Sequence, residues 1–161
     1  MHIVHIFISP EHNFFGHHGQ PAGTAPVIEL EKATLVAGMG IEGDRFFGWK
    51  DDYKGQVTFF SREVYESLCA EFQVWDRGPG VFRRNLVVSG VDLNALTGEE
   101  FTVQGLRFLG TAECSPCHWM DEAFHPGTEA SLKNRGGLRA KILSGGVLRC
   151  EAATAPMDGA V

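Results

Sequence analysis

The chain has 161 residues, 43% of them hydrophobic and 21% charged, and its formal net charge at pH 7 is −6. This length and composition indicate one globular domain with a core large enough to need no cross-links. The acidic balance argues against a surface that binds nucleic acid or anionic membranes, so we expect neither as a partner.

The N-terminal residues, MHIVHIFISP, lack the basic region and the long apolar stretch of a signal peptide. No apolar run approaches the length of a membrane span. These features predict a cytoplasmic protein, in which cysteines are normally reduced thiols because cytosolic disulfides are rare. The four cysteines are Cys69, Cys114, Cys117 and Cys150, and we expect the first and the last to be small core residues.

Short apolar segments typical of strands recur along the chain. Residues 2–8 predict a buried strand that ends at Pro10, and residues 11–25, rich in Gly, Pro and His, predict a loop. Gln104-Gly105 predicts a tight hairpin turn between two later strands. The other expected strands comprise residues 27–30, 33–38, 56–60, 85–88, 100–103, 106–112, 137–143 and 147–152.

After the strand at residues 56–60, one segment has the periodicity of a helix. Ser61 can cap its N-terminus, and Glu63 suits its first turn. Val64, Leu68 and Phe72 then recur every four residues, which predicts one amphipathic helix.

Many short strands with one clear helix and few short helices favour a mostly β fold, a β-barrel or a sandwich, over alternating βαβ units. No repeat and no interdomain linker interrupts the sequence. We therefore expect a single domain over residues 1–152 and a flexible C-terminal tail over residues 153–161.

Several arginines lie beside glycines or in predicted turns, where backbone amides can join a guanidinium around a small anion such as a phosphate. They are Arg45, Arg83, Arg135 and Arg139. The alternative interpretation is that each is a solvated surface residue.

The segment AECSPCHWMDE places Cys114 and Cys117 three positions apart, with Pro116 between them. Such a pair fits a disulfide, a zinc site, a redox switch or a single working thiolate. His118 and His125 could complete a Cys2His2 set, but all four ligands would crowd one loop at atypical spacing, so we expect no stoichiometric zinc. A thioredoxin-like dithiol normally opens a helix in a βαβ setting, which is not predicted here.

Five motifs in this order resemble one known family. They are GMGIEGDRF, QVTFFSREVYESL, PGVFRRNLVVSGVDLNAL, LGTAECSPC and GLRAKILSGGVL. Together they resemble the MOSC domain, the module named after the C-terminal part of molybdenum-cofactor sulfurases, over roughly residues 1–152. The resemblance implies a β-barrel with a few helices, in agreement with the pattern of strands.

The resemblance also implies a ligand and a working residue. Family members bind molybdenum cofactor (molybdopterin) or are thought to carry sulfur for it, and the cysteine at the position of Cys117 either ligates molybdenum or carries sulfane sulfur. A thiolate suits both tasks, because it is a soft metal donor and a strong nucleophile. The residues expected to hold the cofactor in one pocket with Cys117 are Arg45, Arg83, Asn85, Arg139 and Gln20.

Two positions depart from the family pattern. Gln20 stands where a lysine often helps to hold the phosphate of the cofactor, and Phe46 follows the GDR motif where histidine is common. Gln20 can donate a hydrogen bond but brings no charge. We expect Asp44 and Asn85 to support the local structure rather than to transfer protons.

Four functions remain open at this point. The resemblance implies two of them: the protein could reduce N-hydroxylated small molecules, as some family members do, with electrons from a separate donor, or deliver sulfur or cofactor to a molybdoenzyme acceptor. It could also be a non-catalytic ligand-binding module or a zinc or redox CxxC protein.

Overall fold

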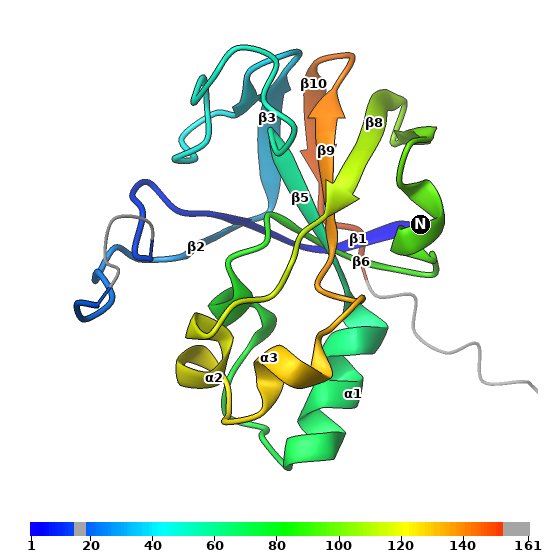
Figure 1. Cartoon of the computed structure of the whole chain (residues 1–161). Coiled ribbons are helices and arrows are strands. Elements are labelled where there is room, and N and C mark those ends of the chain that lie inside the picture. Colours follow the sequence, from blue (N-terminus) through cyan, green and yellow to red (C-terminus); the bar gives the residue numbers. More distant parts are fainter. Residues whose placement is uncertain (15–18, 153–161) are drawn as a thin grey trace, which may run out of the picture.

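The computed structural model describes residues 1–14 and 19–152, which form two β-sheets with helices gathered at one end (Figure 1). The strands are β1 (His2–Ile8), β2 (Ile28–Leu30), β3 (Lys32–Val36), β4 (Gly40–Ile41), β5 (Val57–Ser61), β6 (Leu86–Ser89), β7 (Glu100–Val103), β8 (Leu106–Glu113), β9 (Leu138–Ile142) and β10 (Gly146–Arg149). The larger sheet has the strand order β2-β1-β6-β5-β9-β8-β7, and the smaller one has the order β10-β3-β4.

The mostly β class predicted from the sequence is confirmed, but the sheets are not closed into a barrel. In the described part of the chain, β2 and β7 lie at opposite ends of the seven-strand order and do not pair with each other. A barrel requires hydrogen bonds between the first and the last strand. The strands therefore form two open sheets.

The helices are α1 (Arg62–Phe72), α2 (Trp119–Ala123) and α3 (Thr128–Ser131), with two short 3-10 helices, η1 (Pro79–Phe82) and η2 (Leu93–Leu96). β5 runs directly into α1, and the chain returns through η1 to β6, which is parallel to β5. This one parallel crossover was not expected from the sequence. It brings the end of η1 beside β5.

The predicted caps and turns of the elements are confirmed. The Ser61 hydroxyl accepts a hydrogen bond from the backbone N–H of Val64 at 3.2 Å, so α1 begins where the sequence predicted. Between β7 and β8, Gln104 and Gly105 both have positive φ angles, of 48° and 81°, as a two-residue hairpin turn requires.

Replacing Ser61 by alanine is expected to lower the free energy of unfolding by about 1 kcal/mol, because one N–H of the first turn loses its acceptor. Ser67→Ala, inside the same helix, is the control and should change it by less than about 0.5 kcal/mol, since alanine is the better helix former. Urea unfolding monitored by circular dichroism measures both. Equal losses for the two variants would contradict the capping role.

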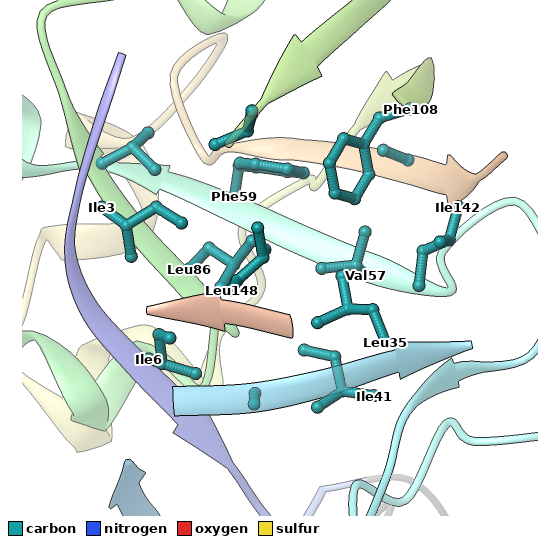
Figure 2. Close-up of a cluster of buried hydrophobic side chains, with 14 of the residues drawn as sticks. Ile3, Ile6, Leu35, Ile41, Val57, Phe59, Leu86, Phe108, Ile142 and Leu148 are labelled. Carbon is teal, nitrogen blue, oxygen red and sulfur yellow. The ribbon is translucent and has the colours of Figure 1, made fainter. Parts of the chain in front are cut away.

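Two groups of buried apolar side chains stabilise the fold. The first fills the space between the two sheets, as Figure 2 shows; its labelled members are Ile3, Ile6, Leu35, Ile41, Val57, Phe59, Leu86, Phe108, Ile142 and Leu148. The second packs the helices against the large sheet and comprises Phe60, Leu68, Cys69, Phe82, Met120, Phe124 and Leu132. Cys69 is therefore a core residue, as expected, and Cys150 packs partly buried against the first group.

Two expectations concern regions beyond these elements. The tail predicted over residues 153–161 lies outside the described residues. Within the described ones, no helix is both long and apolar enough to cross a membrane.

Candidate functional site

A small cavity of about 110 Å³ lies where several loops meet the large sheet. It is lined by Arg45, Phe46, Tyr53, Gly55, Thr58, Arg83, Arg84, Cys114 and Arg139. We refer to it as the arginine cavity. It brings together three of the arginines predicted from the sequence, Arg45, Arg83 and Arg139, although they are far apart along the chain.

Arg45 is presented by the turn that follows β4. The buried carboxylate of Asp44 fixes this turn, because it accepts hydrogen bonds from the backbone N–H of Ser9 at 3.0 Å and of Phe46 at 3.2 Å. The same carboxylate lies 3.3 Å from Nη1 of Arg45. The Arg45 guanidinium also lies over the ring of Phe46, 4.7 Å from its centroid. Asp44 thus has the supporting position expected of it.

Arg83 follows η1 and has a left-handed backbone conformation, with φ of 56°. Non-glycine residues adopt this conformation rarely, and such strain is often found at functional sites. Its side chain is buried, and Nη2 donates hydrogen bonds to the hydroxyl of Ser9 at 2.6 Å and to the carbonyl of Glu11 at 2.8 Å. The guanidinium is therefore fixed at the wall of the cavity.

Arg139 lies on β9, beside β5. Among the described residues, its guanidinium has neither a hydrogen-bond partner nor an ion-pair partner, although it is only partly exposed. An anion in the cavity would give this guanidinium a charge-assisted hydrogen-bond partner. Arg139 therefore has unused donors at the cavity.

The electrostatics of the cavity favour an anion. Burial and, next in size, the positive charge of Arg45 lower the pKa of Arg83 to about 10, against the opposing effect of Asp44. Burial also lowers the pKa of Arg45; Asp44 opposes this shift and Arg84 adds to it. None of the described residues that line the cavity is a carboxylate. A bound anion would relieve the repulsion between these guanidiniums.

The two thiols of the CxxC pair have different positions. Cys114 directly follows β8, is 5% exposed and lines the arginine cavity. Cys117 is half-buried, and its carbonyl accepts a hydrogen bond from the N–H of Met120 at the start of α2. It is not among the residues that line the cavity. The structure thus brings the predicted arginines together with Cys114, while Cys117 lies three residues further along the same loop.

The other predicted ligands lie elsewhere. Asn85 is buried and joins three strands: its amide oxygen accepts from the N–H of Thr58 at 3.0 Å, and its amide nitrogen donates to the carbonyl of Phe7 at 3.1 Å. This is a structural role, and Asn85 does not line the cavity. Gln20 is exposed and does not line it either.

Sequence reasoning did not single out Arg84 and Cys114 as residues of the cavity. A usable signal existed for Cys114, because it lies two residues after the end of the strand predicted over residues 106–112. Arg84 carried no such signal. It is the neighbour of Arg83 in the sequence, and only the folded chain shows which backbone carbonyls its guanidinium contacts. For metal ions, no group of three or more His, Cys, Asp or Glu residues within 1–14 and 19–152 could hold one.

Comparisons with known proteins agree with this fold. A family model described as MOSC domain matches residues 17–154. YuaD from Bacillus subtilis superposes with a TM-score of 0.70 at 16% identity, over 91% of this chain and 90% of that one. YiiM from Escherichia coli has a TM-score of 0.61 at 18% identity, over 92% of this chain and 66% of that one.

YiiM from Geobacillus stearothermophilus has a TM-score of 0.65 at 11% identity, over 92% of this chain and 70% of that one. No curated protein matches the sequence. At such low identities the structural matches show a shared fold.

Proposed function

Because the chain belongs to the MOSC domain family, which is associated with molybdenum-cofactor binding, we propose that the arginine cavity holds the phosphate of that cofactor and that Cys117 supplies the working thiol. One observation carries the proposal. Arg45, Arg83 and Arg139 line one cavity, and the described residues around it include no carboxylate in its lining.

The size and the donors of the cavity fit a phosphate. Its volume of about 110 Å³ is several times the roughly 30 Å³ of a water molecule but below the roughly 300 Å³ at which pockets for drug-sized ligands begin. It therefore has room for a phosphate group and not for a whole pterin. Guanidinium groups are well suited to phosphate oxygens, because they offer paired donors in a fixed plane.

The residues of this chain would have two roles, binding the phosphate and ligating the metal. Arg45, Arg83 and Arg139 would neutralise and orient the phosphate, and Cys117 would offer a soft thiolate to the metal. When bound, the cofactor supplies a redox-active metal. The partly exposed Cys117 would be reachable by a small molecule from solvent.

We propose that the protein, with molybdenum cofactor bound, reduces N-hydroxylated small molecules. Two electrons and two protons convert an N–OH group into N–H and water, and the electrons would come from a separate redox protein. A second candidate, delivery of sulfur to a molybdoenzyme, is favoured by the partial exposure of Cys117. Its thiolate would take sulfane sulfur from a donor persulfide, which leaves as a thiolate, and the persulfide formed can reach an acceptor. Sulfur on Cys117 that cyanide removes would indicate a persulfide and would therefore support delivery of sulfur over reduction.

The cofactor assignment is tested by purifying the full chain from cells that make molybdenum cofactor and measuring molybdenum and pterin per chain. We expect close to one of each. Protein that carries neither, although the same cells load another molybdoenzyme, would overturn the assignment.

The affinity for an anion should also fall at high pH. The protonated guanidinium of Arg83 binds the anion, and its pKa is lowered to about 10. Affinity for inorganic phosphate should therefore drop about fourfold between pH 8 and pH 10.5, where an ordinary arginine would still be fully charged. Isothermal titration measures the change, with circular dichroism as the check that the fold persists. A flat profile would contradict the participation of Arg83.

A further inference from the structure

We propose that Arg84 is a positioning residue that holds residues 114–117, the thiol loop, against the arginine cavity. The inference deepens the proposed function, because that function needs a thiol at a fixed place beside the anion. The contacts that carry it are, however, independent of any ligand. They join three segments that are distant in sequence.

The Arg84 guanidinium uses its donors on backbone carbonyls. Nε donates to the carbonyl of Gly136 and Nη2 to the carbonyl of Cys114, each at 3.1 Å. Nη1 donates to the carbonyl of Phe82, also at 3.1 Å. One side chain therefore ties the thiol loop and the segment before β9 to the end of η1.

Two glycines near the thiol loop have no room for a side chain. A Cβ on Gly136 would lie 2.4 Å from the carbonyl oxygen of Cys114 and 3.0 Å from Cδ of Pro116. A Cβ on Gly137 would lie 2.3 Å from the carbonyl oxygen of Phe59, and its φ is +113°. The N–H of Cys114 also donates to the carbonyl of Gly137 at 2.8 Å. The start of the thiol loop is thus fixed both by close backbone contacts and by Arg84.

The hydrogen bonds of Arg84 differ from those of Arg139, which also lines the cavity. Three of its five N–H donors are directed at carbonyls, whereas the Arg139 guanidinium makes no hydrogen bond within the part of the chain that the structure describes. A planar fork can reach three carbonyls at once, and a lysine ammonium on a flexible stem cannot. Arg84 therefore orders the protein around the cavity, and Arg139 remains available to an anion.

The test uses the cofactor-free full chain and the rate at which iodoacetamide alkylates each cysteine, resolved by peptide mass spectrometry. In Arg84→Lys and Arg84→Ala, alkylation of the buried Cys114 should rise by about tenfold or more, because the loop opens when its charge-assisted bonds are lost. Alkylation of Cys69, on the buried face of α1, should stay slow. Arg62→Lys, on the exposed face of α1, is the matched control and should leave all four rates unchanged.

Chemical rescue distinguishes positioning from general loosening. Guanidinium ion at low concentration should restore the protection of Cys114 in Arg84→Ala, whereas methylammonium at equal ionic strength should not, because it lacks the planar fork. Gly136→Ala should expose Cys114 as well, and Gly78→Ala, whose Cβ would meet nothing within 4 Å, should not.

Two results would overturn the proposal: unchanged protection of Cys114 in both Arg84 variants, or a rise at Cys69 as large as that at Cys114. The proposal would also be wrong if Arg84→Ala bound inorganic phosphate more weakly while Cys114 stayed protected from alkylation. Arg84 would then be an anion ligand and not a positioning residue. Because no cofactor is used, these outcomes are separate from the fate of the molybdenum assignment. That assignment fails only if the purified chain carries no molybdenum and pterin.

Discussion

In protein purified with its cofactor, replacing Cys117 by serine is expected to lower the amount of molybdenum per chain by about tenfold or more. A serine hydroxyl is a hard donor that stays protonated near neutral pH, so it replaces a soft thiolate poorly at a metal that already has sulfur ligands. The measurement is molybdenum per chain by elemental analysis, alongside the thermal unfolding temperature, which should hardly change because Cys117 is half-buried on a loop.

Cys114→Ser and Cys150→Ser are the matched variants for this experiment. Cys150 packs against the far side of the core, where burial raises the pKa of its thiol, so Cys150→Ser should retain full molybdenum. Cys114 is the thiol that lines the arginine cavity. If Cys114→Ser lost the metal while Cys117→Ser retained it, the working thiol would be Cys114 and our assignment would be wrong.

Removing one guanidinium from the cavity is the second large effect we expect. Arg45→Ala and Arg139→Ala should each weaken binding of cofactor, or of inorganic phosphate as its substitute, by about ten- to a hundredfold. Each loses charge-assisted hydrogen bonds that contribute roughly 1.5–3 kcal/mol. The stability of the free protein should stay nearly constant in Arg139→Ala, whose guanidinium makes no hydrogen bond to the described residues. Arg45→Ala should lower it, because the buried carboxylate of Asp44 loses its ion pair.

Arg149→Ala is the control, since Arg149 is exposed on β10 and away from the cavity. It should change phosphate affinity by less than twofold, as expected for a solvated surface charge. Arg83→Ala is less informative, because it also removes the hydrogen bonds to Ser9 and Glu11. If Arg149→Ala and Arg139→Ala lost phosphate affinity equally, phosphate binding would depend on the net charge of the protein and not on the arginine cavity.

Much of the fold was predictable because local patterns determine it. The period of Val64, Leu68 and Phe72 and the cap at Ser61 predicted α1, and Gln104-Gly105 predicted the β7–β8 hairpin. α2 and α3, of five and four residues, are too short to show a helical period. The choice between a closed barrel and two open sheets depends on which distant strands pair, which no local pattern reports.

The site was predictable in part for the same reason. Arg45, Arg83 and Arg139 lie beside turns or glycines, so local sequence marked them, and the structure places all three on one cavity. Arg84 acts through carbonyls 30 and 52 positions away, at Cys114 and Gly136, and only the folded chain brings these together. The resemblance pointed to Cys117, whose role stays a prediction.

The most direct test of the central claim is a crystal structure of the protein purified with its cofactor, with data collected at the molybdenum absorption edge. We expect phosphate density between the guanidiniums of Arg45, Arg83 and Arg139 and an anomalous molybdenum peak beside the sulfur of Cys117. A fully occupied cofactor whose phosphate lies outside this cavity would contradict the account.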